Sequence, residues 1–74
     1  MNMKHYKTYV QIGLNIMYYR KQQGLTQEQA AEMIDITQQH LQRVETAHAA
    51  PSLDTLLDIA ELLGVSVQKL FEAR

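Results

Sequence analysis

Apolar residues recur along this chain at the spacing of amphipathic helices. Ile12, Ile16 and Tyr19 follow one another at intervals of four and three residues, which predicts a helix over residues 9–23. Gly24, directly after this segment, is the residue type that ends a helix in the left-handed conformation. A second stripe predicts the strongest helix of the chain, which Ser52 caps and Gly64 ends. Its inward residues are expected to be Leu53, Leu56, Leu57, Ala60 and Leu63.

Two shorter helices are predicted between these segments. Thr26 and Gln29 have the spacing of a capping box, which satisfies free amides at a helix start. The helix that they open is expected to stop at Asp35. Thr37 is a second candidate N-cap, for a helix that runs to about Glu45. The expected inward residues of the two helices are Ala30, Ala31, Ile34, Leu41 and Val44, with Ile36 in the turn between them.

The end of the chain completes an all-α pattern. Ser66 starts a last short turn that is expected to insert Leu70 and Phe71 into the core. Gly13, Gly24, Gly64 and Pro51 punctuate the segments, and none of the segments alternates as a strand does. We therefore predict a compact domain of five short helices over residues 10–74, preceded by a flexible basic arm over residues 1–9.

The composition excludes several functional classes. The 74 residues amount to a single domain, and the absence of cysteine removes disulfides and thiolate metal sites. The three histidines have no metal-ligand spacing with acidic residues, and there is no glycine-rich phosphate loop. No apolar run approaches the roughly 20 residues of a membrane span, and the start lacks a secretory signal. We expect a cytoplasmic protein that is not an enzyme and that has no metal or cofactor.

The net charge of −1 conceals a gradient along the chain. Residues 1–25 carry four basic residues and no acidic one, residues 26–45 sum to −3 and residues 46–74 sum to −2. Because nucleic-acid binders usually have a basic footprint, composition alone argues mildly against that function.

The spacing of the two short helices, residues 27–34 and 38–45, is that of a helix-turn-helix. The residues around them resemble the phage-repressor-like, or XRE-type, helix-turn-helix family, whose lambda-repressor-like domains have five helices. The resemblance covers residues 12–72. It rests on Arg20, the run from Gly24 to Ala31, the run from Pro51 to Leu57, and Leu63-Gly64-Val65-Ser66. Asp35 stands where the family usually has glycine, at a modest conformational cost.

The resemblance implies that the second helix of the motif, within residues 27–45, enters the major groove of double-stranded DNA. Glutamine can bond adenine and arginine can bond guanine in bidentate pairs. Glutamine is also a good helix former that often covers a solvated face, and that alternative stays open here. The expected base contacts are Gln38, Gln39, Gln42 and Arg43.

Contacts to the DNA backbone are expected at the helix starts, where free amides and the helix dipole favour anions. The candidates are Thr26, Gln27, Thr37 and His40. The loop over residues 46–50 has no lysine or arginine, whereas the family often has basic residues there. We therefore expect few phosphate contacts and a shallow salt dependence.

Arg20 and Glu45 are expected to form a structural ion pair. In the family an equivalent, largely buried pair joins the first helix to the end of the recognition helix. By this resemblance the pair sets the angle of the recognition helix and contacts no base.

A second apolar stripe predicts a surface for association. Val10, Leu14, Met17 and Tyr18 lie beside the core stripe of the first helix, at positions where the family generally has polar residues. An exposed patch of this kind marks an association site, whereas the alternative is that these side chains thicken a small core. Operators of such domains are usually paired half-sites, so a homodimer is expected.

Together these features predict a sequence-specific, repressor-like transcriptional regulator. The competing interpretation is a protein-interaction module of the same fold, such as an antitoxin or a domain of a larger regulator. The weak charge, the loop without basic residues and the extra apolar stripe would suit that alternative.

Overall fold

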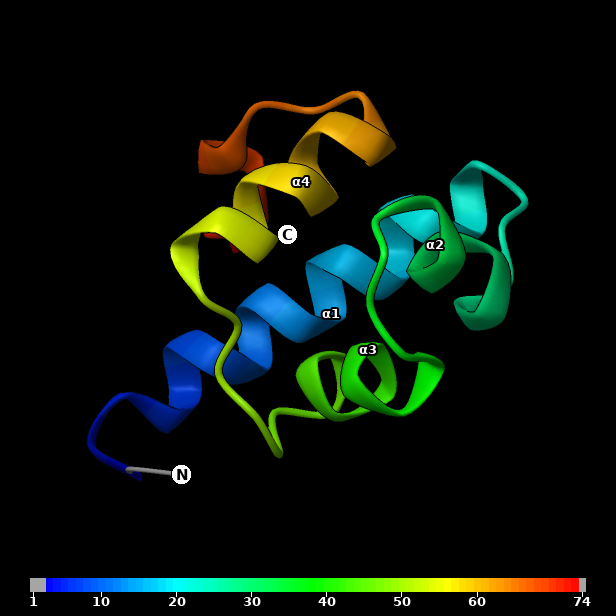
Figure 1. The fold of residues 1–74 in the computed structure, drawn as a ribbon. Helices are drawn as coiled ribbons and strands as arrows, with labels where there is room; N and C mark the ends of the chain where they lie inside the picture. The colour runs from blue at the N-terminus through cyan, green and yellow to red at the C-terminus, as the bar shows by residue number, and fades with distance from the viewer. Residues whose placement is uncertain (1–2, 74) are drawn as a thin grey trace.

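A computed structural model describes residues 3–73 of the chain, and these residues form helices and connecting loops without any strand (Figure 1). The all-α prediction is confirmed. The elements follow the order η1 Met3–His5, α1 Tyr6–Gln22, α2 Gln27–Met33, α3 Gln38–Glu45, α4 Leu53–Leu63 and η2 Val67–Leu70.

The long helix α1 is the centre of the fold. Figure 1 shows α4 above α1 and α3 below it, with α2 beside α3. The C-terminal turn η2 packs against both α1 and α4. Because α1 contacts α3 and α4 on different sides, it joins α3, and the α2 helix packed on it, to the rest of the domain.

The predicted helix ends are confirmed. Thr26 Oγ1 accepts a hydrogen bond from the Gln29 amide over 3.0 Å, and Gln29 Oε1 accepts one from the Thr26 amide over 2.9 Å, which completes the capping box. At the starts of α3 and α4, the hydroxyl oxygens of Thr37 and Ser52 each accept a hydrogen bond from the amide three residues further on. Gly24 and Gly64 follow their helices in the left-handed conformation, with φ values of 72° and 70°.

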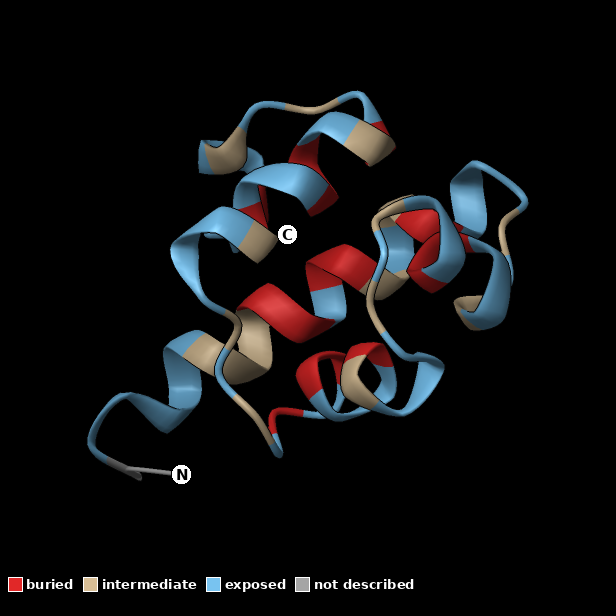
Figure 2. Cartoon of the chain, in the orientation of Figure 1, coloured by how far each residue is buried: buried red, intermediate tan, exposed pale blue. Residues whose placement is uncertain are grey.

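The buried residues gather where the helices face one another, as the red segments of Figure 2 show. Most of the predicted core positions are confirmed as buried, and Ile59 joins them. Leu25, Ile34 and Ile36 are half-buried against this cluster. The fully packed apolar side chains are Ile12, Ile16, Ala30, Ala31, Leu41, Val44, Leu56, Ile59, Ala60, Leu63 and Leu70.

Two leucines and one phenylalanine that were predicted to point inward are exposed instead. Leu53, Leu57 and Phe71 keep 67%, 45% and 49% of their accessible surface. The side of α4 that packs on the domain is the one that carries Leu56, Ile59 and Leu63. Leu53 and Leu57 lie at the edge of that side, and Leu53 lines an open groove of about 280 Å³ with Tyr9 and Phe71. The apolar stripe of α4 is therefore wider than the surface that this chain covers.

Two predicted boundaries also change. The helix expected over residues 9–23 begins at Tyr6, so residues 6–9 of the predicted arm form its first turn, and Tyr9 packs against the core. Residues 1 and 2 of that arm lie outside the described residues. The expected fifth helix is a single 3-10 turn, η2, so the described residues contain four α-helices rather than five.

Asn15 holds the C-terminal turn against α1, which the sequence did not suggest. Its side chain is fully buried, and its Nδ2 donates to the carbonyl oxygens of Leu70 and Glu72 over 2.9 and 2.8 Å. A third contact reaches the Lys69 carbonyl over 3.3 Å. Because an unsatisfied buried carbonyl is costly, one amide at the centre of α1 stabilises the end of the domain.

Candidate nucleic-acid interface

The pair α2 and α3 is built around a tight turn over residues 34–37. Asp35 has a φ of 60°, the left-handed conformation that the family usually assigns to glycine at this position. Asp tolerates this conformation better than most residues, because its short side chain can form local hydrogen bonds. The turn leads directly into Thr37, whose Oγ1 accepts from the His40 amide over 3.0 Å.

The two faces of α3 differ sharply in character. Leu41, Val44 and Glu45 are buried against α1 and α2. The opposite face is polar and open to solvent. It presents the four residues expected to contact bases, all exposed: Gln38, Gln39, Gln42 and Arg43.

Arg43 differs from the three glutamines in having an internal partner. One of its terminal nitrogens, Nη2, donates to the carbonyl oxygen of His48 over 3.2 Å. The backbone oxygen of Arg43 also accepts from the amides of His48 and Ala49. A guanidinium has five N–H groups, so this contact leaves donors for an external acceptor while it ties the side chain to the loop.

The loop after α3 is tightly folded rather than extended. Ala47 is buried and has a φ of 61°, an unusual conformation for a residue with a β-carbon. Thr46 Oγ1 donates to the Gln42 carbonyl over 2.9 Å and lies 2.8 Å from Nδ1 of His48. No sequence signal indicated this turn, because alanine is not a turn-forming residue.

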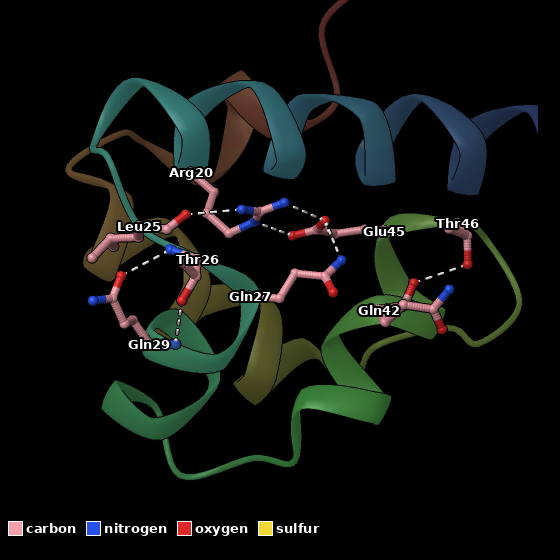
Figure 3. Close-up of polar contacts among 8 residues, drawn as sticks. All are labelled: Arg20, Leu25, Thr26, Gln27, Gln29, Gln42, Glu45 and Thr46. Atoms are coloured by element: carbon pink, nitrogen blue, oxygen red, sulfur yellow. Dashed lines mark hydrogen bonds and ion pairs between the residues drawn. The ribbon is translucent and has the colours of Figure 1, made fainter.

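The residues expected to contact the DNA backbone lie at the starts of α2 and α3. Thr26, Gln27 and Thr37 surround the first turns of these helices, and His40 is half-buried one turn into α3. Gln27 has a further partner: its Nε2 donates to Glu45 Oε1 over 3.0 Å, as Figure 3 shows. A glutamine amide has two N–H groups, so one remains for another acceptor.

Arg20 and Glu45 form a buried, two-pronged ion pair between α1 and the last turn of α3. Arg20 Nε donates to Glu45 Oε2 over 2.7 Å, and Nη2 donates to Oε1 over 3.0 Å. The two side chains keep only 8% and 0% of their accessible surface. A third guanidinium nitrogen, Nη1, donates to the Leu25 carbonyl over 2.8 Å (Figure 3). The network therefore links α1, the α1–α2 loop, the start of α2 and the end of α3.

Gly13 decides how closely α1 and α3 approach. A β-carbon on Gly13 would lie 2.8 Å from the Val44 carbonyl oxygen and still nearer to that of Glu45. The prediction that Gly13 punctuates the chain was wrong, since it lies inside α1. A glycine in the interior of a predicted helix was the available signal, because that position costs stability unless a close contact requires it.

The stripe expected to form a dimer surface lies on α1 beside the end of α3. Leu14 and Tyr18 keep 48% and 41% of their accessible surface, whereas Val10 and Met17 are half-buried. An open groove of about 230 Å³ is lined by Val10, Leu14 and Met17 of this stripe, together with Tyr6, Glu45, Thr46 and Ala47. The stripe therefore thickens the core only in part.

The described residues hold neither a metal-binding cluster nor a membrane-spanning helix. No group of three histidine, aspartate or glutamate residues converges as a metal site among residues 3–73. Within the same residues no helix has the length and apolar character needed to cross a bilayer.

The fold and the capped α2–turn–α3 unit define a helix-turn-helix protein. The family model described as helix-turn-helix matches residues 16–70, so the chain belongs to that family, whose XRE-type members it resembles. It is 36% identical to the uncharacterized HTH-type transcriptional regulator y4dJ of Sinorhizobium fredii, covering 74% of this chain and 71% of that protein.

Two further similarities agree with this membership. The chain is 41% identical over 82% of its length to the uncharacterized HTH-type transcriptional regulator RC0668 of Rickettsia conorii, of which it spans about half, 49%. Among solved structures, the restriction-modification controller protein C.AhdI of Aeromonas hydrophila superimposes with a TM-score of 0.86 at 28% identity. That match covers 92% of this chain and 99% of that chain.

Proposed function

We propose that this chain is a sequence-specific, repressor-like transcriptional regulator that inserts α3 into the major groove of double-stranded DNA. The observation that carries the proposal is the polar, exposed face of α3, which stands on a buried network and is flanked by two capped helix starts. Glutamine and arginine side chains that project from such a helix can reach base edges. The family membership and the names of the relatives support the same conclusion.

Gln38, Gln39, Gln42 and Arg43 are the proposed base-contacting residues. Thr26, Gln27, Thr37 and His40 are the proposed backbone contacts. Each backbone candidate lies in the first turn of α2 or α3 or caps it, where free amides and the helix dipole favour a phosphate. Among the base-contacting residues, Arg43 is held toward the loop by His48 and has the most restricted reach.

The proposed assembly is a homodimer on an inverted repeat, with the α1 stripe as part of its interface. A single module covers few base pairs, and two-fold proteins bind half-sites about one helical turn apart. The exposure of Leu14 and Tyr18 supports a surface that a partner covers. Substituting Leu14→Glu together with Met17→Glu is expected to abolish dimers in light scattering, and an unchanged mass would exclude this stripe.

The experiment for DNA recognition is selection from a random duplex library at low salt. The parent chain is expected to enrich an inverted repeat with half-sites about ten base pairs apart. A Gln38→Ala/Gln39→Ala variant should lose that enrichment. A Gln68→Ala variant, which removes an exposed glutamine of η2 far from α3 in the sequence, is the control and should keep it.

The second candidate function is a protein-interaction module of the same fold. The apolar side chains of Leu53, Leu57 and Phe71, exposed beyond the α1 stripe, favour this alternative. Absence of any enriched sequence with a folded protein would support it. A partner that still binds the Gln38→Ala/Gln39→Ala variant would do the same.

A further inference from the structure

The exposed side of α1 combines apolar and basic residues. One line along the helix carries Lys7, Leu14 and Lys21, which are spaced seven residues apart. Tyr18 lies one turn from Leu14 on the same side. All four are exposed. The helix contains no acidic residue from Tyr6 to Gln22, and Arg20 is occupied in the buried ion pair. We refer to Lys7, Leu14, Tyr18 and Lys21 as the basic α1 face.

The exposed side of α4 has the opposite charge. Leu53 and Leu57 lie on it one turn apart, beside three carboxylates, and α4 contains no basic residue from Leu53 to Leu63. These positions are all exposed, and the turns of α4 that carry them are pale blue in Figure 2. The acidic α4 face consists of Leu53, Asp54, Leu57, Asp58 and Glu61.

The two faces match each other both in charge and in apolar content. We propose that the basic α1 face of one copy docks against the acidic α4 face of a second copy. Each face repels a second copy of itself, because its charges have one sign, whereas the pairing of α1 with α4 brings lysines to carboxylates around an apolar centre. Burial of the four exposed apolar side chains, Leu14, Tyr18, Leu53 and Leu57, supplies the non-directional part of the attraction.

The helix α2 is the other acidic candidate, and it fits less well. Its exposed residues include Glu28 and Glu32, but Met33 is its single large exposed apolar side chain. Its start also belongs to the proposed DNA-binding surface. A second copy docked there would compete with DNA, whereas α4 lies on the other side of α1 from α3, as Figure 1 shows.

The inference rests on the homodimer of the proposed function and names the surface that faces the α1 stripe. A contact between two different faces forms twice in a two-fold dimer, or repeats head to tail when the pair does not close. It also predicts that association weakens as salt rises, because exposed charges are screened beyond a Debye length of about 8 Å at physiological ionic strength.

Charge reversal tests the pairing by sedimentation equilibrium of the DNA-free protein. Lys7→Glu/Lys21→Glu makes both faces acidic, and Asp58→Lys/Glu61→Lys makes both basic. Each variant alone is expected to weaken association by about tenfold or more. An equimolar mixture of the two variants should restore it, since each then meets a face of opposite charge. Asp54 is left in place because a carboxylate in the first turn stabilises α4.

The control reverses an acidic residue outside the proposed interface. Glu32→Lys, which lies beyond the first turn of α2, is expected to leave association unchanged, and thermal melts of every variant establish that each one folds. Failure of the mixture to restore association would overturn the pairing. So would a parent chain whose association is unaffected by the reversals on α1 and on α4. A parent chain that stays monomeric at high concentration would also overturn it. The Gln38→Ala/Gln39→Ala variant should associate normally, which separates this test from that of DNA recognition.

Discussion

Glu45, the last residue of α3, accepts two hydrogen bonds from the guanidinium of Arg20 on α1, over 2.7 and 3.0 Å. Both charges are buried, and Gln27 adds a third bond to the carboxylate. The pair joins the helix at the centre of the fold to the end of the helix proposed to read DNA. It can therefore set the position of α3 without contacting a base.

Removal of one member of this pair should be strongly destabilising. Glu45→Ala leaves the Arg20 charge buried without its partner, a change that typically costs about 3–5 kcal/mol. For a domain of this size each kcal/mol lowers the melting temperature by about 4–8 °C. Calorimetry of Glu45→Ala against Glu32→Ala, an exposed acid on α2, measures the effect, and equal melting temperatures would refute the structural role.

Gly13→Ala should destabilise the domain although it improves helix propensity. In an unconstrained helix this exchange gains about 1 kcal/mol. Here the new methyl group would meet the backbone carbonyls of Val44 and Glu45, which cannot move as a side chain can. We expect a net loss of about 1–3 kcal/mol in a denaturant titration, as for other overpacked sites. A gain in stability would show that α1 and α3 do not approach this closely.

Asn15→Ala should loosen the C-terminal turn. The substitution leaves three backbone carbonyls of residues 69–72 without their donor. The bond to the Leu70 carbonyl is the buried one, and a buried group that loses its partner costs about 1–3 kcal/mol. Amide exchange in η2 is expected to accelerate more than exchange in α2. Uniform acceleration throughout the chain would contradict a local role.

Asp35→Gly should be neutral or mildly stabilising, by up to about 1 kcal/mol, because glycine adopts a φ of 60° without strain. Asp35→Val should instead be destabilising, since a β-branched residue is poorly accommodated there. The ordering Gly, Asp, Val in unfolding free energy checks the turn. A valine variant as stable as the parent would mean that the turn has another conformation.

DNA affinity should depend only weakly on salt. The loop after α3 has no lysine or arginine, so it adds no basic side chain to the proposed DNA surface. The slope of log K against log salt scales with the number of phosphates neutralised, and we expect it to be shallower than about −6 per dimer. Fluorescence anisotropy on the selected operator measures it, and a steeper slope would reveal phosphate contacts beyond those proposed.

The sequence by itself determined the local structure of this protein. Capping residues and left-handed glycines act within a few positions of the chain, so Thr26, Thr37, Ser52, Gly24 and Gly64 indicated helix ends that the structure has. The period of the apolar residues identified most of the core, because one face of each amphipathic helix must be buried.

Only the tertiary structure decided which of several possible faces each helix buries. The apolar stripe of α4 is wide enough to include Leu53 and Leu57, and the packing of α1 and η2 covers just one side of it. The roles of Gly13 and Asn15 depend on α1 meeting the end of α3 and the end of the chain. Those contacts join residues that are more than 30 positions apart in the sequence, and no local pattern records them.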